Sequence, residues 1–210
     1  MTSNMDSPRL QYRQGRVGPL GHYWFLTFEH ASELHALTKQ CQHVIDTAYF
    51  DPTPVDGLHL TLDRIAYDGA STPEQLASVV AVAHSVCSDQ APFTLTFERL
   101  TNLRGAIGFV VSPAEYVRSL RETLRAATLS VFSDPPVKDS SSAPHVTIAY
   151  PIFEGLSPKA AATAQTIDAT VESVAVAISE VVMVALERRE HSYSWQVVAR
   201  IPLGPNKARM

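Results

Sequence analysis

The sequence predicts an α+β protein with two similar lobes that face one cleft and are related by a pseudo-two-fold axis. Three observations support this prediction. The order strand, helix, strand, helix, strand occurs twice, the same four-residue motif falls in the middle strand of each copy, and a turn-forming loop rich in proline precedes it both times. Because a recurring order of strands and helices is common in α+β proteins, the motif and its loops carry the inference.

The first copy is expected to begin with a strand over residues 21–29, which are aromatic and apolar. A serine cap favours a helix over 32–48. After the motif, Thr72–Gln75 has the spacing of a capping box with proline at the first helical position, so a helix is predicted over 73–88. Strict alternation of polar and apolar residues predicts a strand over 93–98.

The second copy repeats the plan with a strand over 106–111. A second capping box, Ser-Pro-Ala-Glu, predicts a helix over 112–131, and the Ser-Pro pair at Ser157 predicts the next one. The apolar runs 174–186 and 193–201 are expected to form a hairpin or two neighbouring strands.

The repeated motif is an H-x-T-x tetrad with apolar residues at both x positions, His59–Leu62 and His145–Ile148. The loops 50–56 and 132–139 precede the two tetrads. With 8 His and 16 Thr in 210 residues, about 0.6 H-x-T pairs are expected by chance, so the shared context makes the repeat informative. In a strand, each histidine and its threonine lie on one face and the aliphatic residues on the other.

Composition sets limits on the class of protein. With 45% hydrophobic and 18% charged residues, the chain is typical of a soluble globular domain, which we expect over 21–203 between a flexible segment 1–20 and a tail 204–210. Its polar start and its two cysteines without paired spacing favour a cytoplasmic protein that binds no metal. The net charge of -4 argues against long nucleic acid as partner, and no membrane is expected because no apolar run is long enough to cross a bilayer. A monomer is expected.

Two histidines that converge on one cleft can divide the cleavage of a phosphodiester. A neutral imidazole deprotonates the nucleophile, and a protonated one supplies the proton for the leaving oxygen. The hydroxyls of Thr61 and Thr147 can donate hydrogen bonds to phosphate oxygens. Asp63 shares the face of His59 if the strand stays regular and would favour a protonated ring, whereas a bulge would turn it away.

The paired tetrads, the aromatic first strand and the doubled order resemble the 2H phosphoesterase superfamily, most closely its 2',5' RNA ligase-like branch. The resemblance covers about residues 21–203. It implies a bilobed α+β fold in which two antiparallel sheets line a central cleft, with helices outside. It also implies hydrolysis of 2',3'-cyclic phosphates or 2',5'-phosphodiester bonds without metal or cofactor, and it assigns His59, Thr61, His145 and Thr147 as catalytic.

The expected substrate is a small nucleotide or an RNA end, so aromatic side chains are candidates to bind a base. Four are selected, although core packing is the alternative for each of them: Tyr23, Tyr150, Tyr193 and Trp195. Two other functions stay open, a nucleotide-binding or sensor module with little turnover and a 2',5' ligase of RNA ends.

Overall fold

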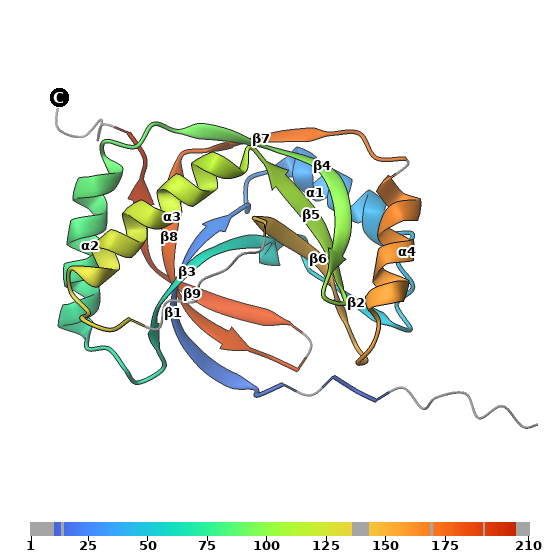
Figure 1. Cartoon of the computed structure of the whole chain (residues 1–210), viewed down its shortest axis with the longest axis horizontal. Coiled ribbons are helices and arrows are strands. Elements are labelled where there is room, and N and C mark those ends of the chain that lie inside the picture. The colour runs from blue at the N-terminus through green and yellow to red at the C-terminus, as the bar shows by residue number, and fades with distance from the viewer. Residues whose placement is uncertain (1–10, 14, 136–142, 169, 191, 205–210) are drawn as a thin grey trace, which may run out of the picture.

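The computed structural model describes residues 11–13, 15–135, 143–168, 170–190 and 192–204. In this part of the chain, helices flank two antiparallel sheets (Figure 1). The elements, in chain order, are β1 (Gly18–Thr27), α1 (Ser32–Gln42), β2 (Phe50–Pro52), the 3-10 helix η1 (Val55–Gly57), β3 (His59–Tyr67), α2 (Pro73–Cys87), β4 (Phe93–Leu103), β5 (Ala106–Ser112), α3 (Ala114–Leu129), β6 (His145–Pro151), α4 (Ser157–Asp168), β7 (Val174–Ile178), β8 (Glu180–Arg188) and β9 (Tyr193–Pro202).

Each sheet contains one tetrad strand. The first sheet has the order β3-β1-β8-β9 and the second β2-β6-β5-β4-β7, with neighbouring strands antiparallel throughout. Apart from the short β2, the two orders correspond strand for strand, and the tetrad strands β3 and β6 contact each other where the sheets meet. The predicted α+β fold with two antiparallel sheets around a cleft is confirmed.

The lobes do not coincide with the two halves of the sequence. Strand β4 follows the first tetrad but joins the second sheet, whereas β8 and β9 return to the first sheet. The helices cross over as well, because α1 packs on β6 and β7 while α3 packs on β3 (Figure 1). Each lobe therefore depends on both halves of the chain, which favours cooperative folding as one unit.

Several predicted boundaries need correction. The first helix ends at Gln42 rather than near residue 48, because a local turn takes over, in which the backbone N–H of Ala48 donates to Asp46 Oδ1 at 3.0 Å. The capping box predicted at residue 112 is wrong, since this serine still belongs to β5 and Pro113, which has no side-chain acceptor, stands at the cap. The box at Thr72–Gln75 is confirmed, with both of its hydrogen bonds.

The apolar run 174–186 is not one strand. It divides at Ser179, so that β7 forms an edge of the second sheet and β8 lies inside the first. Part of the segment expected to be flexible is held in place, because the backbone N–H of Arg13 donates to Ile152 O at 2.9 Å and β1 already begins at residue 18. The prediction of a flexible segment cannot be compared for residues 1–10 and 14, which lie outside the described residues. The same is true of residues 205–210 of the predicted tail.

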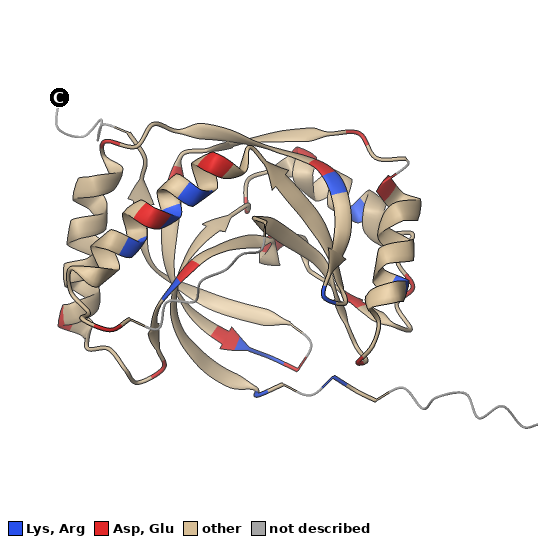
Figure 2. Ribbon diagram, viewed as in Figure 1, with Lys and Arg blue, Asp and Glu red and all other residues tan. Residues whose placement is uncertain are grey.

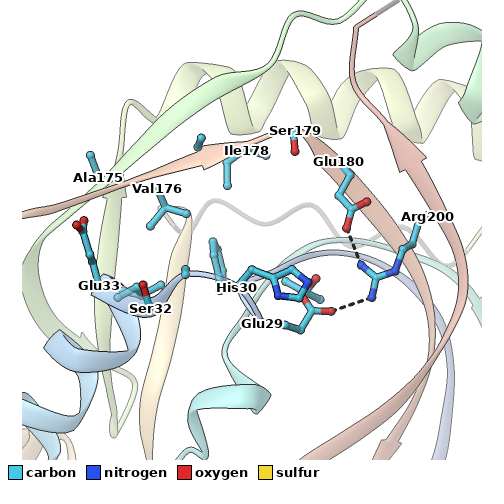
Figure 3. Close-up of a pocket in the computed structure, with 15 residues that line it drawn as sticks. Glu29, His30, Ser32, Glu33, Ala175, Val176, Ile178, Ser179, Glu180 and Arg200 are labelled. Atoms are coloured by element: carbon cyan, nitrogen blue, oxygen red, sulfur yellow. Dashed lines mark hydrogen bonds and ion pairs between the residues drawn. The ribbon is translucent and has the colours of Figure 1, made fainter. Parts of the chain in front are cut away.

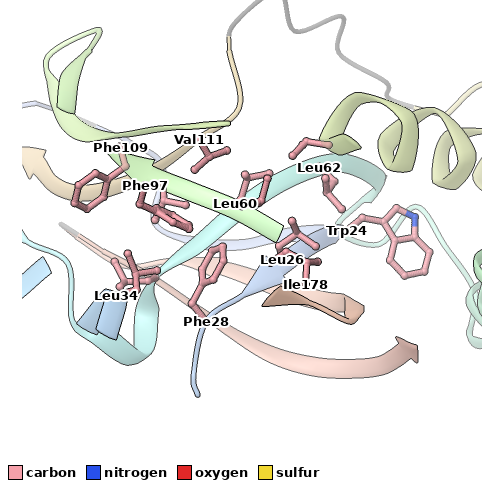
Figure 4. Packing of buried hydrophobic residues seen from close by; sticks show 14 of the residues in the cluster. Trp24, Leu26, Phe28, Leu34, Leu60, Leu62, Phe97, Phe109, Val111 and Ile178 are labelled. Atoms are coloured by element: carbon pink, nitrogen blue, oxygen red, sulfur yellow. The ribbon is translucent and has the colours of Figure 1, made fainter. Parts of the chain in front are cut away.

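The core lies between the sheets and the helices. Figure 4 shows side chains from β1, β3, β4 and β5 interleaved there. Strand β1 alternates between two environments, with Trp24 and Leu26 in this core and Tyr23 and Phe25 in a second, smaller cluster on the opposite face of the first sheet. This second cluster forms an aromatic wall beside the first tetrad.

Candidate active site

Both tetrads occupy the first four positions of their strands, β3 and β6. The apolar members point into the core, where all four are nearly inaccessible to solvent: Leu60, Leu62, Val146 and Ile148. The histidines and threonines point to the other side, as the two-residue period of a strand requires. They line one cleft of about 360 Å³ that contains all four of them: His59, Thr61, His145 and Thr147.

The two imidazoles are held in the same way. His59 Nδ1 lies 2.9 Å from the carbonyl oxygen of Gly57, and His145 Nδ1 lies 2.9 Å from that of Ala143. A carbonyl oxygen only accepts, so each Nδ1 carries the proton and donates. In the neutral form of each ring, Nε2 is therefore the basic nitrogen, and the same orienting bond fixes both rings.

A β-bulge follows each threonine. In the pairing of β1 with β3, Phe25 lies opposite Thr61 and Trp24 opposite Asp63, so Leu62 is the extra residue. In the pairing of β5 with β6, the register steps from Thr147 to Ala149 in the same manner. A bulge shifts the alternation of side chains by one position, so the residue three beyond each threonine, and not the one two beyond, faces the cleft.

This shift decides which polar groups reach the site. The bulge turns Asp63 away from His59 and brings Arg64 to the cleft. Tyr150 takes the corresponding position in the cleft after the second tetrad. Asp63 is buried and pairs with Arg125 of α3 through two contacts, at 2.9 Å and 3.2 Å. The bulged alternative for Asp63 is therefore the correct one.

His59 is enclosed by aromatic rings. Phe25 stacks on it with ring centroids 4.5 Å apart and planes inclined by 13°, and the edge of Trp195 lies across it at 5.0 Å. Burial lowers the pKa of His59 from 6.5 to about 4, the carbonyl of Gly57 acts in the opposite sense, and repulsion from His145 adds to the lowering. The ring is neutral at pH 7 in the absence of ligand.

The four aromatic candidates all lie around the tetrads. Tyr23, Tyr150 and Tyr193 line the cleft itself, and Trp195 lines an adjoining hollow of about 260 Å³ that also contains His59. Tyr23 is only 8% exposed and accepts a hydrogen bond from Arg64 Nε at 2.8 Å, so it orients that arginine. Burial is the main reason that the pKa of Tyr150 lies above its ordinary value.

Two charged residues of the cleft were missed from the sequence. Arg64 required knowledge of the bulge, because a regular strand places it on the core face. Arg13 reaches the cleft from the N-terminal segment through backbone pairing with the chain after β6, for which the sequence contains no signal. Both are cations beside the two histidines, in a chain whose net charge is -4.

A larger hollow lies elsewhere. It measures about 790 Å³ and lies between the start of α1 and β7, with none of the tetrad residues in its wall (Figure 3). Its polar rim is internally paired, since Arg200 donates to Glu29 at 2.9 Å and to Glu180 at 2.6 Å. We assign the site to the tetrad cleft because the convergent titratable groups are there.

Within the described residues, no three His, Cys, Asp or Glu side chains are grouped closely enough to hold a metal ion. The helices in the described ranges are all too short or too polar to span a bilayer.

Two antiparallel sheets that each present an H-x-T-x tetrad to one cleft define the 2H phosphoesterase class. The chain belongs to the 2'-5' RNA ligase superfamily, whose family model matches residues 29–190.

Solved structures show the same fold. TT0787 of Thermus thermophilus superposes with a TM-score of 0.66 at 19% identity, covering 88% of this chain and 99% of that chain. LigT of E. coli complexed with 3'-AMP gives a TM-score of 0.62 at 17% identity, covering 88% and 98%. LigT is also known in complexes with NADP+ and with ATP. A comparison with curated proteins finds no match.

Proposed function

We propose that this protein is a phosphodiesterase that opens 2',3'-cyclic phosphates, or cleaves 2',5'-phosphodiester bonds, in a small nucleotide or at an RNA end. One observation carries the proposal: two histidines, each oriented by the same Nδ1 hydrogen bond, line one cleft together with two threonines and two arginines. Proton transfer between paired imidazoles and a substrate needs no metal ion.

The environments of the histidines suggest their roles. His59 is neutral in the empty site, so its Nε2 can accept a proton from the attacking water as the water oxygen bonds to phosphorus. The bond from phosphorus to the leaving ribose oxygen breaks as His145, in the imidazolium form that carries a proton on both nitrogens, donates its Nε2 proton to that oxygen. Proton exchange with solvent then restores both rings. A base with a pKa of about 4 is weak, but the negative charge of bound phosphate raises that pKa.

The remaining cleft groups are suited to hold the phosphate. The hydroxyls of Thr61 and Thr147 can donate to nonbridging oxygens, and the guanidinium of Arg64 offsets the charge that builds on them in the transition state. Arg64 is already fixed by Tyr23, which reduces the conformational entropy lost when it binds an anion.

The aromatic wall supports a nucleoside as the organic part of the substrate. Tyr193 and Trp195 lie in edge contact with His59, and Tyr150 lies 5.5 Å from Tyr193 between ring centroids. Bases stack on such surfaces with little dependence on sequence. The complexes of LigT with 3'-AMP and ATP support a nucleotide ligand for this chain as well.

The experiment is product analysis with the protein in EDTA. Cyclic 2',3'-AMP and a 2',5'-linked diadenylate are incubated with it and followed by phosphorus NMR and mass spectrometry. We expect at least one to be converted to a monophosphate. Recovery of both unchanged contradicts the proposal, and tight binding of an unchanged nucleotide then indicates the binding module instead. Joining of a cyclic-phosphate RNA end to a 5'-hydroxyl partner indicates the ligase.

A further inference from the structure

A second cavity, of about 210 Å³, adjoins the cleft on the side of His145. Both cavities are lined by Tyr23, Thr61, Arg64 and His145, so the smaller one opens directly onto the tetrads. At ~30 Å³ for each water molecule, it has space for about seven waters, which is enough for a phosphoryl group.

Helix α3 supplies two more arginines to the smaller cavity. Arg118 and Arg121 both line it, and they are three residues apart, so they lie on the same face of the helix. Arg125 continues this face four residues further along and is paired with the buried Asp63 of β3. This ion pair joins α3 to the tetrad strand and so fixes the position of the two arginines relative to Thr61.

We call this cavity the arginine pocket, defined by Arg64, Arg118 and Arg121. Its positive charge is not compensated: in the part of the chain that the structure describes, no ion pair engages any of these three arginines. The carboxylate in its wall, Asp63, is already bonded to Arg125. Acidic segments do alternate with basic ones along α3 (Figure 2), but its two glutamates, Glu115 and Glu122, do not line the cavity.

Three arginines that line one cavity and have no ion pair within the described residues supply the positive charge and the N–H donors that a phosphate binds. The tetrads lie between this pocket and the hollow that contains Trp195, so a ligand in the cleft has aromatic rings on one side and arginines on the other. Resting on the proposed function, we propose that the arginine pocket binds a second phosphoryl group of the substrate, and that the enzyme selects nucleotides with two phosphates over those with one.

The test measures this selectivity directly by calorimetry, with ligands that cannot turn over. Adenosine 3'-monophosphate is compared with adenosine 3',5'-bisphosphate, where the second phosphate is terminal, and with a 3'-phosphorylated, 3',5'-linked diadenylate, where it is an internal diester. The variant is Arg118→Gln/Arg121→Gln, which removes two charges and keeps good helix formers. Arg99→Gln is the control, since Arg99 is exposed on β4 and lines neither of the two cavities. Circular dichroism verifies that the variants are folded.

We expect at least one of the two-phosphate ligands to bind about tenfold more tightly than the monophosphate, and added salt to reduce that ratio. The double variant should lose the preference, and Arg99→Gln should keep it. The two-phosphate ligand with the higher affinity shows whether the second phosphoryl group is a nucleotide 5'-phosphate or a diester of the RNA backbone. Equal affinities in the wild type, no binding at all, or a preference that survives in the double variant overturns the inference. If the product analysis shows catalysis but calorimetry shows no preference for two phosphates, the arginine-pocket inference is wrong and the proposed function stands. If calorimetry shows the preference but no ligand is converted, the pocket is correctly assigned and the proposed function is wrong.

Discussion

Replacing Trp195 by alanine removes one of the three aromatic rings that contact His59 and should raise the pKa of that histidine. In the intact protein, burial between Phe25 and Trp195 lowers the pKa from 6.5 to about 4, which amounts to roughly 3 kcal/mol disfavouring the charged ring. Water that enters on the side of Trp195 should recover part of that energy. We expect the pKa to rise by about one unit, since Phe25 still covers the other face.

The assay is an NMR titration of the histidine ring protons in the wild type and in Trp195→Ala, with His59→Ala to assign the resonance. The same shift predicts how stability depends on pH. The unfolded chain binds a proton at His59 below pH 6.5 and the folded chain only near pH 4, so this site lowers the free energy of unfolding as the pH falls through that window, by at most about 3 kcal/mol. A wild-type pKa of 6.5 or above, or the same pKa in both proteins, refutes the reasoning.

Three further variants test the framework of the site. In Gly108→Ala, the new Cβ collides with the carbonyl of Val146 and lies 2.9 Å from Thr147 Cα, so a loss of about 1–3 kcal/mol in urea unfolding and a lower kcat are expected; equal stability contradicts this. Asp63→Asn breaks the buried ion pair with Arg125 of α3 and should lower the free energy of unfolding by about 3 kcal/mol. Glu29→Gln breaks a more exposed ion pair with Arg200 and should lower it by less than about 1 kcal/mol. Equal losses in the two variants contradict a structural role for the buried pair. Thr147→Val should lower kcat/KM by about tenfold or more with little change in urea midpoint, and unchanged kinetics contradict its role.

The tetrads could be predicted from the sequence because their signal is local. Alternation within His59–Leu62 and His145–Ile148 assigns the faces of each strand without knowledge of its neighbours. The convergence of both tetrads on one cleft also followed from the doubled order. These four residues are placed by the structure where the prediction expected them, while their catalytic roles stay predictions.

The bulges could not be predicted, because they depend on how β1 and β5 pair with the tetrad strands. They exchange Asp63 for Arg64 in the cleft, and so change the sign of the charge that faces the substrate. The division of the run 174–186 between two sheets has a similar origin, since Ser179 and Glu180 are the only polar residues in the run and the pairing within each sheet separates β7 from β8. The arginines of α3 became visible only when the structure showed this helix packed on β3.

The central claim is that His59 and His145 act together on one phosphodiester, and steady-state kinetics on the better substrate test it most directly. We predict that His59→Ala and His145→Ala each lower kcat by about 10² to 10⁴, and that the double variant is hardly worse than either, because the two residues act as a unit. His84→Ala, on the exposed face of α2, should retain wild-type activity. Wild-type kcat in either active-site variant would contradict the account.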